Sequence, residues 1–423
     1  MYSSKYTSNQ IVLFFFVLCL SLLLIPNIML LTFVLIIFSG ILLIYTRHNL
    51  MAFLSALIVA YSNYSLVVYR YWGRDLMDDY NSFSQKPEID LTALRIVTFF
   101  TIILVVILWR FQNKQIFHNF SHDIICHERT RSNPILVFLT CITLVVIWVL
   151  YYSFSFGEQA GYSPQYEYST VFFIIGLKYT GNSKFLTTLL LLLACFYILF
   201  DFLGGQRSTG VQIALIVVLM KFYKYLTPKL VLTMVLSGMI LTRLVATFRA
   251  SLFMTDFTIG DILSSMTETM FASDTAGQAY YTSLTFVATM DIYPLITRLG
   301  QFGDFVTSIF VSGADEGLAW ICNRHFEHGF GGILGIYMYY YLGYLGTFLI
   351  ACLVGFYYKM MMVTTSSLSQ LNNWAFIVCV YVAATTIRWY VYSPSQLLRG
   401  VLLLSLVYYG YTILNKITKF KKV

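Results

Sequence analysis

Apolar stretches long enough to cross a bilayer recur along almost the whole chain, and this feature limits the fold more than any other. A helix needs about 20 apolar residues to cross about 30 Å of hydrocarbon. The run from Ile11 to Ile44 is too long for one crossing and is interrupted at Pro26–Asn27, so it predicts a hairpin of two helices. Ten further spans are predicted at about 50–70, 91–110, 134–153, 168–180, 184–203, 208–226, 229–248, 332–358, 374–391 and 396–414.

The sequence therefore predicts an all-α polytopic membrane protein with about 12 transmembrane helices in a single integral membrane domain, residues 1–423. Its composition agrees, because 58% of residues are hydrophobic and 11% charged, whereas soluble domains carry about 25% charge. The seven cysteines include no CxxC pair, so no disulfide framework is expected. No small-residue cleavage site follows the first apolar run, which predicts a retained helix.

The distribution of charge orients these spans. With the N-terminus on the cytoplasmic side, 16 of the 27 Lys and Arg residues fall in cytoplasmic segments, with 2 of the 19 acids. Cytoplasmic loops carry such an excess of basic residues. The net charge of +8 therefore reflects membrane topology, and no nucleic-acid partner is expected. Both termini are predicted to be cytoplasmic.

Three loops are long in this topology. Residues 111–133 form the predicted cytoplasmic loop, and residues 71–90 and 249–331 form two predicted external loops. The second external loop spans about eighty residues, which is far longer than a simple connection. Loops of that length usually carry function, so the external side is the expected side of the chemistry.

Basic residues on the external side need a local reason, because the charge bias disfavours them there. Arg207 follows two glycines in the turn Gly204–Arg207, where a ligand could approach closely and a phosphate could be held by two hydrogen bonds. Arg243 and Arg249 stand six residues apart at the outer end of the ninth span. The alternatives are snorkelling to lipid headgroups for Arg207, and pairing with nearby aspartates for the other two.

Two more arginines fall within the last two predicted spans. Arg388 and Arg399 flank the segment Tyr392–Ser395. A charge at membrane depth is costly and tends to face a cavity or a partner. We expect both to line the same external pocket, with snorkelling near the outer helix ends as the alternative.

The densest group of reactive side chains lies just before the tenth span. Arg324, His325, Glu327 and His328 fall within five residues and are followed by glycines at 329, 331 and 332. A fixed cation beside titratable groups suits acid–base chemistry next to a phosphate. A metal site is the alternative, but no HExxH motif or repeated histidine spacing supports it, so no metal is expected.

These features together resemble the Wzy-type O-antigen polymerase family, over most of the chain. The resemblance rests on the twelve-helix layout, the Gly204–Arg207 turn, Arg249 before a long external loop, and the segment that precedes Gly329–Ile333. Residues 74–80 are similar to a stretch of the related EpsG-like exopolysaccharide proteins. The Arg-x10-Gly signature of some members is missing, because the eleventh residue after Arg207 is Val218.

The resemblance implies a GT-C-type glycosyltransferase of the bacterial inner membrane that acts at the periplasmic face without a cofactor. Donor and acceptor would be oligosaccharide repeat units on undecaprenyl pyrophosphate, with membrane lipids, a chain-length regulator and a flippase as partners. Six arginines would neutralise the pyrophosphate, namely Arg207, Arg243, Arg249, Arg324, Arg388 and Arg399. Acid–base catalysis would fall to His325, His328 or Glu327.

Two other classes of protein fit the same pattern of helices. A lipid-linked oligosaccharide flippase or other transporter also has about twelve helices, but would carry charges near the bilayer midplane and short loops on both sides. An O-antigen ligase shares the chemistry of arginine and histidine. No P-loop, dinucleotide fingerprint or GxSxG motif occurs, so no coupling to ATP is indicated.

Overall fold

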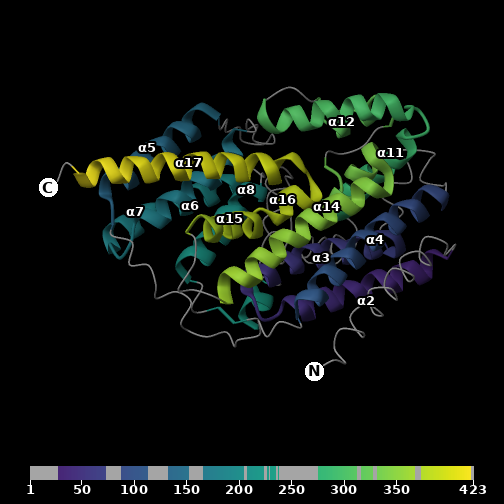
Figure 1. The fold of residues 1–423 in the computed structure, drawn as a ribbon, viewed down its shortest axis with the longest axis horizontal. Helices are drawn as coiled ribbons and strands as arrows, with labels where there is room; N and C mark the ends of the chain where they lie inside the picture. The colour runs from purple at the N-terminus through teal and green to yellow at the C-terminus, as the bar shows by residue number, and fades with distance from the viewer. Residues whose placement is uncertain are drawn as a thin grey trace, which may run out of the picture. The chain divides into compact units, whose positions relative to one another are not determined.

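The computed structural model describes residues 27–72, 87–112, 132–151, 165–203, 207–222, 226–227, 229–234, 237, 275–311, 316–326, 331–366 and 373–420. All regular secondary structure in these residues is helical (Figure 1). Within this part of the chain, six helices are long and apolar enough to cross a membrane, which indicates a multi-pass membrane protein. These segments are Ile28–Thr46, Glu88–Trp109, Pro134–Tyr151, Lys184–Phe202, Leu334–Met362 and Ser395–Ile417.

The helices of the first half of the chain follow the predicted spans closely. They are α2 (Ile28–Thr46), α3 (Leu50–Trp72), α4 (Pro87–Gln112), α5 (Pro134–Tyr151), α6 (Ser169–Tyr179) and α7 (Lys184–Leu203). A short 3-10 turn, η3 (Tyr166–Tyr168), precedes α6, and α8 (Arg207–Val217) continues into the π-helical turn η4 (Val218–Phe222). The first helix of the predicted hairpin and most of the span at 229–248 lie outside the described residues.

Helices also form in the second half of the chain. The predicted external loop at 249–331 contains α11 (Thr275–Thr289), α12 (Leu295–Phe310) and α13 (Leu318–Asn323) in its described part. The helix α14 (Leu334–Ser366) follows. The predicted span at 374–391 consists of two helices, α15 (Asn373–Ala384) and α16 (Thr386–Val391), and α17 (Ser395–Phe420) completes the described chain.

Local sequence signals explain where several helices begin. The Asn27 side chain accepts hydrogen bonds from the backbone N–H groups of Met29 and Leu30 at 2.9 and 3.3 Å, and so caps α2. Pro87 and Pro134 are the first residues of α4 and α5, where a missing N–H costs nothing. These signals are local in sequence, which is why the predicted boundaries agree with the helices.

The chain divides into two compact units. Unit 1 comprises Met1–Asn119, Glu268–Val363 and Thr386–Gln396. Unit 2 comprises Phe120–Thr267, Thr364–Thr385 and Leu397–Val423.

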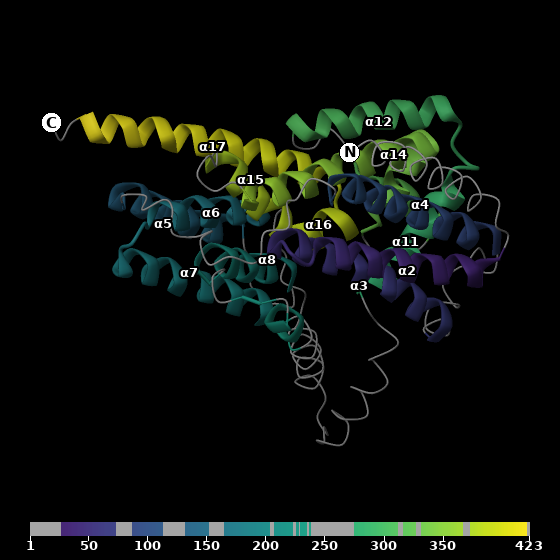
Figure 2. The same ribbon diagram turned by 60° about the horizontal axis from the view of Figure 1, so that its bottom comes forward.

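In unit 1, α2 lies against α3 and α4, as Figures 1 and 2 show. A buried asparagine joins four of its helices. Asn63 of α3 donates to the hydroxyls of Ser39 in α2 and Thr101 in α4, at 3.0 and 3.2 Å. Tyr390 of α16 donates its O–H to the Asn63 carbonyl at 3.1 Å. Since polar groups away from water need partners, this network fixes how the four helices meet.

In unit 2, α5 packs on α6 and α7 packs on α8. Small residues allow close helix contacts, because a Cβ at Gly176 of α6 would lie 2.9 Å from Thr140 of α5. The side chains of Asn133 and Asn415 share a hydrogen bond of 2.9 Å, which ties the start of α5 to α17.

Candidate functional site

The turn after α13 presents Arg324 and His325 at the surface of unit 1. The backbone N–H groups of His325 and Phe326 both donate to the carbonyl of Cys322, at 2.9 and 3.0 Å, and so fold the chain tightly at the helix end. Both Arg324 and His325 are exposed. The sequence cluster therefore stands on a short helix whose buried side, including Cys322, anchors it.

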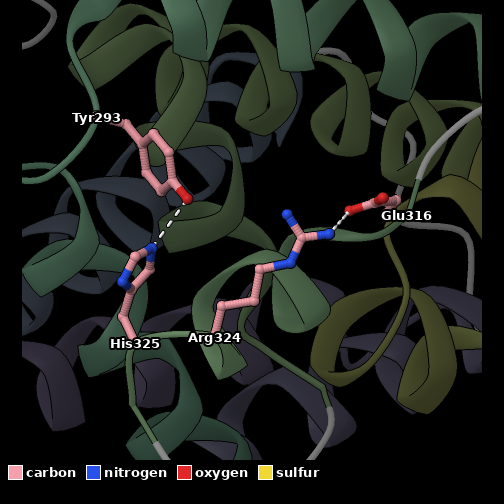
Figure 3. A network of polar contacts seen from close by, with 4 residues as sticks. All are labelled: Tyr293, Glu316, Arg324 and His325. Carbon is pink, nitrogen blue, oxygen red and sulfur yellow. Dashed lines mark hydrogen bonds and ion pairs between the residues drawn. The ribbon is translucent and has the colours of Figure 1, made fainter.

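His325 is oriented by a tyrosine that lies 32 residues earlier (Figure 3). The Nε2 atom of His325 lies 2.9 Å from the hydroxyl of Tyr293, and the two rings meet edge to face with centroids 5.5 Å apart. Tyr293 precedes α12, so the histidine is held between the ends of α12 and α13. If Nε2–H donates to the tyrosine oxygen, Nδ1 keeps its lone pair and can accept a proton.

Arg324 forms an ion pair with Glu316, also shown in Figure 3. The two side chains are 59% and 64% exposed. An ion pair so open to solvent contributes at most about 1 kcal/mol. The guanidinium can therefore exchange the carboxylate for a phosphate at little cost.

The glycines that follow the cluster close the chain onto the end of α16. The N–H of Gly332 donates to the Val391 carbonyl at 2.8 Å. A Cβ at Gly331 would lie 3.1 Å from both Val391 and Tyr392, and one at Gly332 would lie 2.3 Å from the Phe286 ring. Both glycines have positive φ angles, of 112° and 154°, which other residues rarely adopt.

Arg388 contacts a tyrosine that adjoins this glycine pair. Its guanidinium lies 5.2 Å from the centroid of the Tyr392 ring, the same ring that packs against Gly331. The Tyr392 ring thus links Arg388 to the segment that follows Arg324 and His325. Glu327 and His328, which lie between, are outside the described residues.

Two further arginines of unit 1 were not among the predicted site residues. Arg298 of α12 donates to the Tyr340 carbonyl of α14 at 2.8 Å. Arg95 lies inside the apolar span of α4, and Tyr339 of α14 lies within electrostatic range of both arginines. A charge within an apolar stretch is the sequence signal that could have identified Arg95.

In unit 2, Arg399 of α17 donates to the hydroxyl of Tyr168 at 3.4 Å. Arg207 is the first residue of α8, and the structure describes its backbone without its side chain. Arg243 and Arg249 lie outside the described residues. Of the six predicted pyrophosphate ligands, the structure therefore describes the side chains of Arg324, Arg388 and Arg399.

A buried carboxylate in unit 2 was also missed. Asp201 of α7 is fully buried and accepts a hydrogen bond of 2.9 Å from the Tyr166 hydroxyl. Gly210 of α8 packs directly on it, since a Cβ there would lie 3.2 Å from the Asp201 Cβ. Glu167, next to Tyr166, is buried too. An acid inside a predicted span is again the signal that could have identified Asp201.

Among the described residues, no group of three or more His, Cys, Asp or Glu side chains is arranged to hold a metal ion. Comparison of the chain with protein-family models, with curated proteins and with solved structures found no match. Function must therefore be argued from the helices and the side chains themselves.

Proposed function

We propose that this protein is a polymerase of a bacterial surface polysaccharide. It would join oligosaccharide repeat units carried on undecaprenyl pyrophosphate by glycosyl transfer. In this proposal, the six apolar helices belong to a GT-C-type fold of about twelve. The fold lies in the inner membrane with both termini cytoplasmic and with the long segment 249–331 on the periplasmic side.

One observation carries the proposal. The guanidinium of Arg388 in α16 lies over the Tyr392 ring, and that ring packs against Gly331, which follows Arg324 and His325 in the chain. Two cations and an imidazole that bonds to Tyr293 therefore lie in connected segments of unit 1. Arg324 and His325 follow the end of the short helix α13 and lie outside the six candidate spans. A lipid-linked pyrophosphate sits at that level of a membrane, whereas a transporter would place charges near the midplane.

The chemistry follows from these groups. The acceptor hydroxyl oxygen bonds to C1 of the donor sugar, and the bond from C1 to the pyrophosphate oxygen breaks. Arg324 and Arg388 would neutralise the charge that develops on the pyrophosphate, with Arg207, Arg243, Arg249 and Arg399 as further predicted ligands.

The proton of the acceptor hydroxyl also needs a base. His325 would take it on Nδ1, with Tyr293 holding the ring through Nε2. Glu327 and His328 remain the alternative bases. The leaving pyrophosphate needs no proton, because arginines already compensate its charge.

The test uses purified protein in nanodiscs with synthetic undecaprenyl-pyrophosphate-linked repeat units. The proposal expects a ladder of longer glycans and stoichiometric release of undecaprenyl pyrophosphate, without ATP. Arg324→Ala and Arg388→Ala should lose the ladder. Arg47→Ala is the matched control, because Arg47 bonds to His48 at an exposed position that is predicted to be cytoplasmic. Transfer to a lipid A core acceptor without a ladder would instead identify a ligase, and movement of the substrate across the membrane without transfer a flippase.

The predicted sidedness has its own test. Single cysteines at Ser121 and Ser312 would be labelled with a membrane-impermeant maleimide in intact spheroplasts. The charge distribution predicts labelling of Ser312→Cys from outside and of Ser121→Cys after lysis. Labelling of Ser312→Cys from the cytoplasm alone would rule out periplasmic chemistry.

A further inference from the structure

The helix α12 lies in the segment that the charge distribution assigns to an external loop, yet one of its faces contacts α14 of the same unit. Besides the bond from Arg298 to Tyr340, the Tyr340 hydroxyl donates to the side chain of Gln301 at 2.7 Å. The ring of Phe305 lies 5.6 Å from the ring of Tyr341. These contacts fix the orientation of α12 about its own axis.

A second face of α12 is apolar and exposed. Leu295, Leu299, Val306 and Phe310 are between 38% and 74% exposed. At about 100° per residue, these four positions fall within about 60° of one another. Together they form a continuous stripe along the helix, which we call the apolar stripe of α12.

A third face is polar and exposed. This face consists of three exposed residues, Thr297, Asp304 and Thr307. They lie opposite the packed face or between that opposite side and the packed face. A loop helix in water would have no reason to expose the apolar stripe beside this polar face. Helices with separate apolar and polar exposed faces are typical of contact with lipid on one side.

The apolar stripe continues a surface that faces lipid. The candidate span α14 exposes large apolar residues in its later part, at Leu345, Phe348, Leu349 and Phe356. Its earlier part, Leu334–Tyr341, is largely buried, and α12 provides part of that cover. Where α12 covers α14, the apolar stripe of α12 faces outward in place of the covered residues of α14.

The direction of α12 agrees with this. Figures 1 and 2 both show α12 running in about the same direction as α2 and α4 of the same unit, along the spanning helices and not across them. Its 16 residues extend about 24 Å, less than the roughly 30 Å of the hydrocarbon layer. The helix can enter the bilayer without adding a crossing.

We propose that α12 is embedded in the bilayer and that its apolar stripe contacts lipid acyl chains. The polar face with Asp304 turns away from those chains. This inference needs only the membrane location of unit 1 and does not depend on the proposed polymerase activity. It places Tyr293, and with it His325, at the end of an embedded helix.

The test measures contact with acyl chains directly. Single cysteines replace Leu299 and Val306 on the stripe and Thr297 and Asp304 on the polar face, in a chain whose native cysteines are exchanged. Each is labelled with an environment-sensitive fluorophore and reconstituted in nanodiscs. The proposal expects at least twofold stronger quenching by acyl-chain nitroxide lipids at the two stripe positions, and the reverse order with aqueous iodide.

Equal quenching on both faces, or stripe labels open to iodide and shielded from nitroxide lipid, would overturn the proposal. So would shielding of the stripe labels from both quenchers, because another protein segment or a second copy would then cover the stripe. A second measurement needs no label. Leu299→Asp should sharply reduce the amount of folded protein recovered from membranes, and Thr297→Asp should not. Equal recovery of the two variants would also count against the embedded helix.

Discussion

Replacement of Asn63 by leucine removes the polar junction of unit 1 and keeps the number and branching of the side-chain heavy atoms. Three hydrogen bonds disappear, to Ser39, Thr101 and Tyr390. Hydrogen bonds between helices within membranes contribute on average about 0.6 kcal/mol each, and at most about 1.7. We therefore expect Asn63→Leu to lower the free energy of unfolding by about 2 kcal/mol, since leucine leaves almost no cavity.

A double-variant cycle separates the bond from nonspecific repacking. Tyr390→Phe alone should cost about 0.6–1.7 kcal/mol, because it leaves the Asn63 carbonyl without that donor. In the Asn63→Leu background the same change should cost almost nothing, since its partner is already gone. Equilibrium unfolding in bicelles, followed by tryptophan fluorescence, measures each variant.

Thr143→Val is the matched control for these variants. Thr143 is a half-buried residue of α5 whose hydroxyl donates to the carbonyl of Leu139 in its own helix at 2.9 Å. Its replacement should change the unfolding free energy by less than about 0.5 kcal/mol. A junction role for Asn63 is refuted if Asn63→Leu unfolds like the control, or if the effects of Asn63→Leu and Tyr390→Phe simply add.

Three further predictions address the candidate site and its support. If Arg324 stabilises developing charge, Arg324→Ala should slow polymerisation in nanodiscs about 10²-fold. Arg324→Lys should restore part of the rate, because lysine keeps the charge without the planar fork. A wild-type rate in the alanine variant would exclude the role. Burial raises the pKa of the Cys322 thiol to about 12 from an ordinary 9.0, although hydrogen bonds oppose this shift. Alkylation of Cys322 at pH 8 should thus be about 10³-fold slower in the folded protein than after denaturation, by mass spectrometry, and equal rates would contradict its burial. Gly332→Ala should destabilise the protein by about 1–3 kcal/mol, because its Cβ would meet the Phe286 ring. Gly300→Ala has open space around its Cβ and should be neutral or slightly stabilising. Thermal unfolding of the two variants and the wild-type protein measures both effects.

The sequence by itself determined where most of the described helices outside 249–331 lie. Apolar length is a local property, so the start of α5 and the extent of α7 agree with the predicted spans, whereas α4 begins at Pro87, before its predicted span at 91–110. The division of the predicted span at 374–391 into two short helices was not visible, because periodicity does not reveal a break at Thr385. The helices within 249–331 were hidden for a related reason, since α12 mixes polar residues into its apolar pattern.

Only the tertiary structure decided which distant side chains meet. Three pairs meet through helix packing, which no local signal encodes: His325 with Tyr293, Asp201 with Tyr166, and Gly331 with Tyr392. Asp201 shows the difference most clearly. Its presence in an apolar span could be read from the sequence, but its hydrogen bond to Tyr166 and its contact with Gly210 depend on how α7 meets its neighbours. A buried polar group gains stability only from the partners that packing supplies, and those partners come from other parts of the chain.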